Sequence, residues 1–528
     1  MHIPLFIPDL LKRAVTYYPD KIAVIENEKR LTYTQFQARV NQLSNLLLKL
    51  GVKKGDRVAY LAPNTLQMLE GFFGVMQIGA IMIPFNTRLI ASDYRYMLNH
   101  SEAKVFLVDS ELTGQVEPVM QELTTLEQFL LLTQKAEEHN GGWKNYEKLL
   151  AQVSSDQPER PEMSEMDPAS ILYTSGTTAH PKGVIHSHRS LYFNSINSML
   201  HLNISDKDTL LHTLPLFHVN GWGAPFTFTG AGATHVMLRK INTTEIYHLI
   251  EEEKVSIACM APTVLNMLVN DPLAQSFKVS HCVRVVIAGS PPPPVFIKLV
   301  EEQLGFEFIQ VYGMTEAAPF LTISHVKSHL SQEKEHVYKI KAMAGIPMTH
   351  VEVKVVNALG EPVQPDGKEI GEIITRGNNV MEGYWKQPEE TKKAIQEGWY
   401  FTGDMGTIDE EGYISIVDRK KDIIISGGEN ISSIEVESVL YDHPAILEAV
   451  VISIPHEKWG EVPHAICVLK ENQALSEEEL ITFCRERMSH FKVPKSVQFV
   501  SELPKTASGK IQKVVLREAF WKGEKKVN

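Results

Sequence analysis

The 528-residue sequence contains few cysteines and no long apolar run, and each absence excludes a class of protein. Its four cysteines, Cys259, Cys282, Cys467 and Cys484, are scattered without C-x-x-C spacing, and each lies beside apolar residues. This pattern argues against a disulfide scaffold or a zinc site and predicts reduced thiols in protein cores. The most apolar stretch, residues 71–85, is too short to span a bilayer, which takes about 20 residues.

Targeting signals and an excess of positive charge are also missing. The first eight residues lack the basic start and long apolar core of a signal peptide, and the last seven carry no Ser-Lys-Leu ending. We therefore expect a mature protein that starts at Met1 and resides in the cytoplasm. The 52 Lys and Arg against 64 Asp and Glu leave a net charge of −12, which disfavours nucleic acid as a partner.

A hydroxyl-rich loop over residues 173–184 reads Tyr-Thr-Ser-Gly-Thr-Thr-Ala-His-Pro-Lys-Gly-Val. Its short hydroxyl side chains and glycine can direct many donors at one anion, and its lysine adds a positive charge. A Walker P-loop needs Ser or Thr after the lysine, and Gly183 stands there instead. The alternative interpretation is an ordinary polar surface loop. The candidate phosphate-binding residues are Thr174, Ser175, Gly176, Thr177, Thr178 and Lys182.

Helices and strands alternate along most of the chain. Thr34 and Gln37 form a Thr-x-x-Gln capping pattern that predicts the start of a helix, and short apolar strands are predicted over 58–61 and 81–83. This alternation is typical of layered α/β proteins. A later region with many short strands includes a predicted strand over 351–356.

A small α+β unit follows residue 418. Ser432 and Ser476 each begin a Ser-x-x-Glu cap before a helical apolar pattern. The length of the chain favours more than one domain, and the basic triplet 419–421 marks the boundary. By composition alone this triplet is a solvated turn. The expected divisions are a large domain over 1–418, a hinge over 419–421 and a small domain over 422–528.

Four further blocks follow the hydroxyl-rich loop in order. They are Tyr-Gly-Met-Thr-Glu at 312–316, Tyr-Phe-Thr-Gly-Asp at 400–404, Asp-Arg-Lys-Lys-Asp at 418–422 and Pro-Lys-Thr-Ala-Ser-Gly-Lys at 504–510. Together the blocks resemble the adenylate-forming (ANL) superfamily, and within it the fatty-acid type of AMP-forming acyl-CoA synthetase. The resemblance covers essentially the whole chain. It implies a large layered α/β N-terminal domain with a strand-rich subdomain, and a small mobile α+β C-terminal domain.

The resemblance also implies a reaction. A carboxylate attacks the α-phosphate of ATP to give acyl-AMP and pyrophosphate, and the thiol of coenzyme A then displaces AMP. Lys510 matches the catalytic lysine, Thr315 a donor to the α-phosphate and Glu316 a ligand of Mg²⁺. His218 matches a residue that orients the acid, and Lys421 the hinge. Without the resemblance, Lys510 reads equally well as a surface lysine and Glu316 as a solvated loop residue.

Other residues are implied to contact the nucleotide or coenzyme A. Ala179 departs from the family, which has glycine after the threonine pair, and a left-handed backbone there would cost free energy. The implied contacts are Gly289, Ser290 and Tyr312 at adenine, Asp404 and Arg419 at the ribose, and Gly427 and Gly428 beside the pantetheine tunnel.

The acid is expected to be apolar. The resemblance implies that segments 215–230, 258–270 and 310–315 line the acid pocket. These segments contain no Lys or Arg, so a second carboxylate on the acid would have no counter-ion. A medium or long fatty acid is the first expectation, and an aryl or branched acid is the second. The candidate substrate contacts are His218, Trp222, Phe226 and Gly313, with Phe217, Met260, Leu265 and Met267 as further apolar residues.

Three other functions share some of these motifs. A peptide-synthetase adenylation domain would need an acidic pocket residue and a downstream carrier domain, and neither is seen. A luciferase-like oxygenase can be excluded only by an assay for light or oxygen uptake. A non-catalytic nucleotide-binding protein is disfavoured because Lys510 and Glu316 are both present. The sequence leaves the oligomeric state open, including a homodimer.

Overall fold

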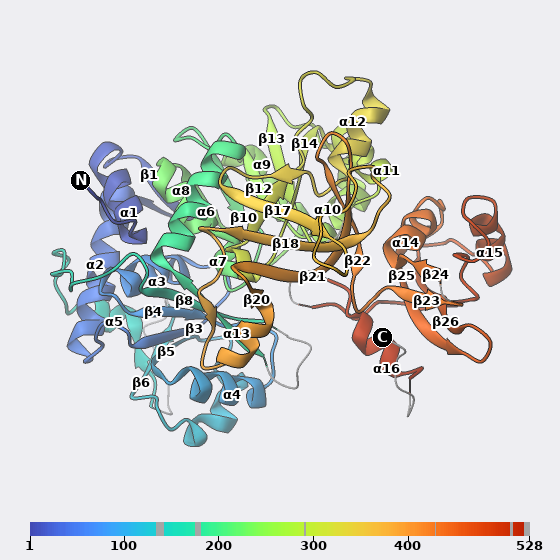
Figure 1. Cartoon of the computed structure of the whole chain (residues 1–528). Helices are drawn as coiled ribbons and strands as arrows, with labels where there is room; N and C mark the ends of the chain where they lie inside the picture. The colour runs from blue at the N-terminus through green and yellow to red at the C-terminus, as the bar shows by residue number, and fades with distance from the viewer. Residues whose placement is uncertain (134–141, 175–180, 290–291, 428, 507–509, 522–528) are drawn as a thin grey trace.

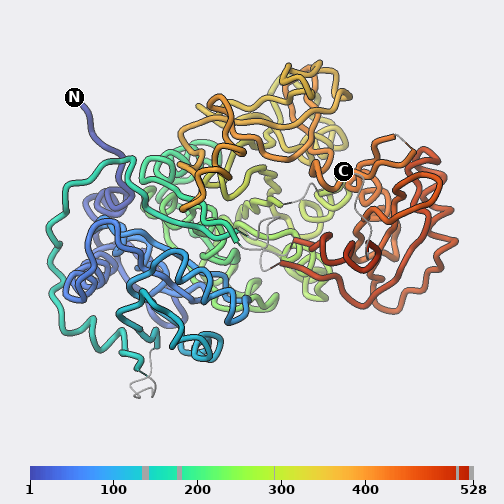
Figure 2. The backbone as a smooth tube through the Cα atoms, turned by 60° about the horizontal axis from the view of Figure 1, so that its bottom comes forward, coloured from blue at the N-terminus to red at the C-terminus, as the bar shows by residue number. Residues whose placement is uncertain are grey.

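A large α/β domain and a smaller C-terminal domain make up the protein (Figure 1). Our computed structural model describes residues 1–133, 142–174, 181–289, 292–427, 429–506 and 510–521. Figure 2, turned from the view of Figure 1, shows the C-terminal domain, in red, beside the rest of the chain. The two-part α/β fold that the sequence implied is therefore confirmed. Across the described ranges, no helix is both long and apolar enough to cross a membrane.

An eight-stranded sheet forms the N-terminal half of the large domain. In spatial order its strands are β19 (Gly383–Tyr384), β9 (Lys182–Ser187), β8 (Pro168–Thr174), β4 (Ile81–Pro84), β3 (Arg57–Leu61), β5 (Ala103–Asp109), β6 (Gln128–Leu132) and β7 (Lys144–Asn145). Its centre is parallel, whereas β8 and β9 are antiparallel neighbours. The predicted strands over 58–61 and 81–83 correspond to β3 and β4.

A nine-stranded sheet forms the second half. In spatial order its strands are β16 (Ile346–Pro347), β15 (Phe320–Ile323), β14 (Phe306–Gly313), β13 (Val283–Ile287), β12 (Ile257–Met260), β10 (Thr209–His212), β11 (Thr234–Met237), β1 (Ile22–Glu26) and β2 (Lys29–Thr32). Strands β10 to β14 run parallel, so their carboxyl ends lie at one edge. Ligands bind at this edge in open α/β sheets, and Gly289 and Tyr312 lie there.

The strand-rich region of the large domain is a separate antiparallel sheet. Its strands are β17 (Val351–Val356), β18 (Gly371–Gly377), β21 (Trp399–Ile408), β20 (Ile395–Gln396) and β22 (Ile414–Arg419). The predicted strand over 351–356 coincides with β17. Strands β21 and β22 pair so that Asp404 lies opposite Arg419. The sheet therefore brings two of the expected ribose contacts together directly before the chain enters the small domain.

Helices cover the sheets of the large domain (Figure 1). The α-helices are α1 (Ile7–Tyr17), α2 (Tyr33–Lys49), α3 (Leu66–Gln77), α4 (Ala91–Ser101), α5 (Tyr146–Leu150), α6 (His188–His201), α7 (Val219–Trp222), α8 (Ala224–Ala231), α9 (Thr243–Glu252), α10 (Pro262–Asn270), α11 (Pro294–Leu299), α12 (Lys334–Lys341) and α13 (Pro388–Ala394). The capping pattern expected at Thr34 lies two residues earlier, because Thr32 and Gln35 form the capping box of α2. Tyr33 is fully buried as the first helical residue, and this burial sets the start of the helix.

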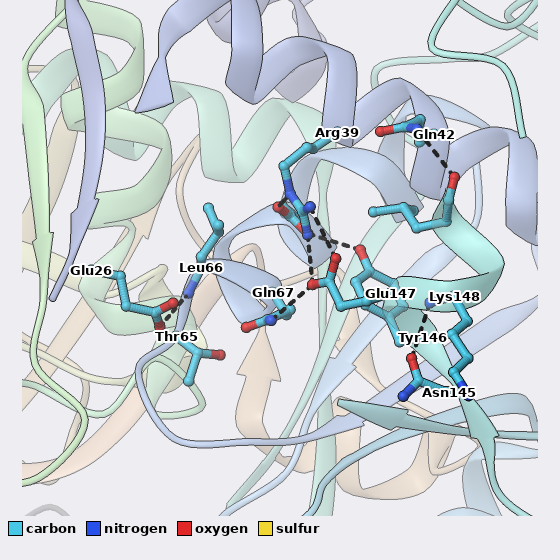
Figure 3. Close-up of polar contacts among 12 residues, drawn as sticks. Glu26, Arg39, Gln42, Thr65, Leu66, Gln67, Asn145, Tyr146, Glu147 and Lys148 are labelled. Atoms are coloured by element: carbon cyan, nitrogen blue, oxygen red, sulfur yellow. Dashed lines mark hydrogen bonds and ion pairs between the residues drawn. The ribbon is translucent and has the colours of Figure 1, made fainter. Parts of the chain in front are cut away.

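A buried ion network joins three helices of the N-terminal half (Figure 3). Arg39 of α2 contacts Glu70 of α3 and lies 2.8 Å from Glu147 of α5. The hydroxyl of Tyr146 donates a 2.8 Å hydrogen bond to Glu70, which is fully buried. A buried carboxylate is tolerated only when charge and hydrogen bonds compensate for its lost hydration. The network therefore couples the positions of α2, α3 and α5.

In its described residues, the small domain consists of a five-stranded sheet with three helices. Its strands are β24 (Glu429–Ile431), β23 (Ile424–Ser426), β26 (Gly460–Leu469), β25 (Ile446–His456) and β27 (Ser496–Phe499), and its helices are α14 (Ser433–Tyr441), α15 (Glu477–Arg485) and α16 (Lys513–Glu518). Ser432 and Ser476 cap α14 and α15, as predicted. The carboxylate of Asp418 accepts a 2.7 Å hydrogen bond from the backbone N–H of Ser433, which ties α14 to the end of the large domain.

The cysteines follow the expectation in three of four cases. Cys259, Cys467 and Cys484 are buried free thiols, whereas Cys282 is exposed. Cys282 lies just before β13, where the chain enters the sheet from the surface. Its apolar neighbour Val283 belongs to the strand and is buried. The prediction that Cys282 is buried was therefore wrong, because it rested on this neighbour.

Candidate active site

The Lys510 side chain reaches from the small domain to the edge of the nine-stranded sheet. A Cβ atom added to Gly289, just after β13, would lie 3.2 Å from Cε of Lys510. Gly289 has a φ of +109°, which only glycine adopts readily. The backbone N–H of Lys510 donates a 3.1 Å hydrogen bond to Oγ1 of Thr506. The fold thus brings together two residues that lie in different domains.

Charged groups of the large domain, including Arg419 at the end of β22, act on the Lys510 ammonium. Burial lowers the pKa of Lys510, and the nearby Arg419 lowers it further, whereas Asp404 and Glu316 raise it. Burial, together with the charge of Lys510, also lowers the pKa of His218 to about 4. His218 is therefore neutral near pH 7. A neutral imidazole beside a cation suits the orientation of an acid better than proton transfer near neutral pH.

Tyr312, Asp404 and Arg419 form a second cluster at the same edge. The hydroxyl of Tyr312 donates a 2.8 Å hydrogen bond to Oδ2 of Asp404, and Nε of Arg419 lies 3.4 Å from Oδ1. Burial raises the pKa of Asp404, and Arg419 opposes that shift. The arrangement places an acceptor carboxylate beside an aromatic ring, which is the chemistry needed to hold a ribose and a base.

Glu316 and Thr315 are positioned by two residues that the sequence did not single out. The hydroxyl of Tyr384 donates a 3.1 Å hydrogen bond to Oε1 of Glu316, and burial raises the pKa of that carboxyl group. Nε2 of His186 lies 2.6 Å from the carbonyl oxygen of Thr315. Tyr384 and His186 are distant from this segment in the chain, so no local pattern could have identified them.

The hydroxyl-rich loop joins the antiparallel strands β8 and β9, with Thr174 paired to Lys182. A Walker loop instead connects a strand to a helix, so the observed topology agrees with rejecting that motif. The predicted contacts Ser175, Gly176, Thr177 and Thr178, and also Ala179, lie outside the described residues. Nζ of Lys182 lies 2.6 Å from Oε2 of Glu390, an acidic partner that the sequence analysis did not expect.

A left-handed turn follows His218. Every residue from Val219 to Gly223 has a positive φ, between 50° and 72°. For non-glycine residues this conformation costs roughly 1–2 kcal/mol each, so the surrounding packing must hold it. Asn220 is fully buried and accepts a 3.1 Å hydrogen bond from Ser170 of β8. The turn sets the direction of Trp222, whose ring packs edge-on against Phe320 at 5.7 Å.

The expected apolar pocket residues divide into three groups. Phe226 has no accessible surface and packs edge-on against Phe72 and Phe73, so it borders no cavity in this structure. Met260 and Leu265 are equally inaccessible, whereas Met267 is 50% exposed on the surface. Trp222 is 7% exposed and Phe217 is half-buried. The burial pattern thus leaves Phe217 and Trp222 as the apolar residues of this set that can meet an acid without moving.

The glycines of the site have different surroundings. Gly313 cannot carry a side chain, because a Cβ atom there would lie 1.9 Å from the carbonyl oxygen of Pro319. Gly427, with a φ of +61°, lies against the ring of Trp459 in the small domain. The predicted contacts Ser290 and Gly428 lie outside the described residues. The expected hinge residue Lys421 is exposed, and its carbonyl accepts a 3.1 Å hydrogen bond from Arg517 of α16.

Comparison with known proteins identifies the class of this site. The model of the AMP-binding enzyme family matches residues 11–385, and that of the AMP-binding enzyme C-terminal domain matches residues 435–510. The chain is 37% identical to a 4-hydroxybutyrate–CoA ligase of Metallosphaera sedula, over 96% of this chain and 93% of the relative. It is 38% identical to a peroxisomal butyrate–CoA ligase of Arabidopsis thaliana, over 98% of this chain and 93% of the relative.

Solved structures agree with these matches. An anthranilate CoA ligase in complex with anthranoyl-AMP superposes with a TM-score of 0.90, 28% identity and 98% coverage of both chains. A fatty acyl CoA synthetase of Mycobacterium tuberculosis superposes with a TM-score of 0.73, 31% identity and the same coverage. The chain belongs to the AMP-binding enzyme family. It is an acid–thiol ligase of the AMP-forming type, which uses ATP and coenzyme A to activate a carboxylic acid.

Proposed function

We propose that this ligase activates an apolar monocarboxylic acid and that Lys510 acts only in the first half-reaction. The observation that carries the catalytic assignment is the position of Lys510 beside Gly289, Asp404 and Glu316. When a carboxylate attacks the α-phosphate of ATP, negative charge accumulates on the reacting oxygens. A buried ammonium in that position offsets this charge, with Thr315 as a further donor.

We assign the nucleotide contacts to the cluster of Tyr312, Asp404 and Arg419. Asp404 accepts the ribose hydroxyls, Arg419 holds Asp404 in its ionised form, and the ring of Tyr312 stacks on adenine. Glu316 is the residue that would hold Mg²⁺, because a hard carboxylate oxygen, completed by phosphate oxygens and water, matches the preference of this ion. When bound, Mg²⁺ neutralises charge on the phosphates. Tyr384 orients the Glu316 carboxylate by its 3.1 Å hydrogen bond.

The second half-reaction needs a different face of the small domain. We propose that the domain rotates about Lys421, which removes Lys510 from the site and brings Gly427 towards the pantetheine arm. The support is that Lys421 is an exposed residue between the end of β22 and the first strand of the small domain. The division at residues 419–421 therefore remains our proposal for the hinge. The cytoplasm likewise remains our prediction for the compartment.

The proposal also concerns which class of carboxylic acid the enzyme activates. Sequence analysis placed a medium or long fatty acid first, and the similarity to a fatty acyl CoA synthetase supports that candidate. The packing of Phe226 favours a shorter pocket, because Phe226 is inaccessible and its ring packs against Phe72 and Phe73. Relatives named for butyrate, 2-methylpropanoate and benzoate are 36–38% identical to this chain. We therefore place a short, branched or aryl acid first.

Pyrophosphate release across a panel of acids tests this proposal. We expect kcat/KM to rise with chain length by up to roughly fourfold per methylene, as its burial of about 0.8 kcal/mol allows, and to fall once the pocket is full. A maximum at or below about six carbons, or at benzoate, supports the short pocket. A rise that continues past ten carbons supports the fatty-acid candidate, and a preference for dicarboxylates contradicts an apolar acid.

Trp222 provides a matched test of the pocket wall. Trp222→Ala should move the optimum to longer or bulkier acids, because it removes the ring that packs on Phe320. Trp222→Phe, which keeps an aromatic ring, should shift the optimum less. The same chain-length profile in all three proteins would exclude Trp222 from the pocket while leaving the adenylation chemistry unaffected.

A further inference from the structure

Lys182 lies between an aromatic ring and a carboxylate. Its ammonium nitrogen is 2.6 Å from Oε2 of Glu390 and 4.9 Å from the centre of the Tyr384 ring. The Lys182 side chain is 15% exposed and that of Glu390 is 29% exposed. An ammonium with so little solvent contact needs a nearby negative charge. Glu390 supplies it from a helix 208 positions further along the chain.

The local fold holds the two partners of Lys182 in place. Strand β19 pairs with β9, so Tyr384 lies opposite Val184, two residues after the lysine. The backbone N–H of Tyr384 donates a 2.9 Å hydrogen bond to Oγ1 of Thr391, which fixes the start of α13 against β19. Glu390 immediately precedes Thr391. The position of the carboxylate beside Lys182 is therefore a product of several fixed contacts.

Tyr384 also links the lysine to the proposed metal ligand. Its ring faces Lys182, and its hydroxyl donates a 3.1 Å hydrogen bond to Oε1 of Glu316. The two groups proposed to act on the phosphates of ATP thus meet at one side chain. Any polyphosphate that engages Lys182 must approach Glu390 as well.

Glu390 has a second cation on its other oxygen. Nζ of Lys393 lies 2.7 Å from Oε1 of Glu390, one turn further along α13. If Lys182 left, Glu390 would still have an opposite charge beside it. Lys182 could therefore move from Glu390 to a phosphate while Glu390 stays paired with Lys393. Neither the ammonium nor the carboxylate would then be left unpaired.

We propose that Glu390 is an exchangeable counter-ion of Lys182, which it neutralises when no nucleotide is bound and releases to the phosphates of ATP. This inference rests on the phosphate-binding role that the sequence predicts for Lys182 in the proposed reaction. The exchange weakens ATP binding, because the ion pair must break and because a carboxylate repels the approaching phosphates. By the same reasoning it speeds the departure of pyrophosphate, since Glu390 recaptures the lysine.

Glu390→Gln tests the proposal, because it removes the charge and keeps the shape. We expect the KM and the Kd for ATP to fall by about two- to fivefold, which is the range expected for a partly exposed ion pair. The inhibition constant of pyrophosphate should fall by a similar factor, and the KM for the acid should not change. Glu390→Asp keeps the charge and should behave like the wild type.

Glu389→Gln is the matched control. Glu389 lies next to Glu390 on α13, is 75% exposed and pairs only with Lys392 in the described structure, at 3.1 Å. Its substitution changes the net charge by the same amount, so it reports any general effect of charge on nucleotide binding. An equal fall in KM for ATP in the Glu389 and Glu390 variants would overturn the proposal, as would an unchanged or raised KM in Glu390→Gln alone.

Lys182→Ala separates this inference from the function on which it rests. It should raise the KM for ATP, and in that background Glu390→Gln should no longer lower it. If Lys182→Ala leaves ATP binding unchanged, the phosphate role of Lys182 is wrong. If Lys182→Ala weakens ATP binding but Glu390→Gln has no effect in the wild-type background, only the counter-ion role is wrong.

Discussion

The hydroxyl of Tyr312 donates a 2.8 Å hydrogen bond to Oδ2 of Asp404 and so joins the end of β14 to the strand-rich sheet. This bond stabilises the ionised carboxylate, which burial disfavours. The proposed ribose site therefore depends on a contact between two sheets, made by residues 92 positions apart in the sequence. After burial and the charge of Arg419, this bond is the next influence on the pKa of Asp404, and it lowers that pKa.

Tyr312→Phe should move the loss of ATP binding on acidification to higher pH. Without the hydroxyl donor the pKa of Asp404 rises further, so the carboxylate becomes protonated earlier as the pH falls. The shift is toward higher pH because the lost hydrogen bond had favoured the charged form of the carboxyl group. The measurement is the KM for ATP between pH 5 and 8. A pH profile identical to that of the wild type would show that this bond does not control Asp404.

Lys510→Ala should lower acyl-AMP formation by several orders of magnitude. It should leave the conversion of supplied acyl-AMP and coenzyme A to thioester nearly intact, because we propose that rotation of the small domain removes Lys510 from the site before the second half-reaction. Each half-reaction is measured separately, with circular dichroism as the control for folding. Equal losses in both half-reactions would contradict an exclusive role in adenylation.

Lys421→Pro should have the opposite effect. Proline restricts φ to about −65°, so a hinge at this residue would hold the small domain in one arrangement. We expect adenylation to survive and thioester formation to fall sharply, as measured by pyrophosphate release and by acyl-CoA production. Lys421→Ala, which removes the side chain but leaves φ free, is the control. Undiminished thioester formation in Lys421→Pro would place the hinge elsewhere.

Glu316→Gln should raise the Mg²⁺ concentration needed for half-maximal activity and slow turnover. The amide keeps the shape of the side chain and removes the charge that would bind the ion. A magnesium titration of pyrophosphate release checks this expectation. Glu382→Gln, a nearby charge substitution, is the control. An unchanged titration would exclude Glu316 as a ligand.

Buried histidines should make the protein less stable as the pH falls below neutrality. Burial lowers the pKa of His186 to about 4, from an ordinary value of 6.5. Between pH 6.5 and 4 the unfolded chain therefore binds a proton that the folded protein excludes. The free energy of unfolding is highest above pH 6.5 on this account, and it falls by up to about 1.4 kcal/mol per pH unit for this residue.

A comparison with His186→Gln isolates that contribution from those of the other titrating groups. Several buried carboxyl groups have raised pKa values and act in the opposite direction, so the total slope is not diagnostic. The difference in stability between the wild type and the variant should shrink as the pH falls from 6.5 to 4. Urea denaturation at several pH values measures it, and a constant difference would contradict a neutral buried His186.

Much of the architecture could be predicted because it is local. The caps at Ser432 and Ser476 and the strand over 351–356 depend on residues within one turn or one strand, and the structure contains them. The helix start near Thr34 was displaced by two residues because Tyr33 is buried against a distant part of the chain. Local pattern predicts that an element exists more reliably than it predicts where the element begins.

The sequence by itself determined the class of enzyme, since five ordered blocks and their residue types need no knowledge of contacts. Only the tertiary structure decided which side chains contact one another. The pairing of Lys182 with Glu390 and of His186 with Thr315 joins residues 208 and 129 positions apart. The full burial of Phe226, which the sequence analysis had expected to line the acid pocket, is likewise a result of packing between helices. Such contacts depend on how separate sheets and helices pack together, and short stretches of sequence do not determine that packing.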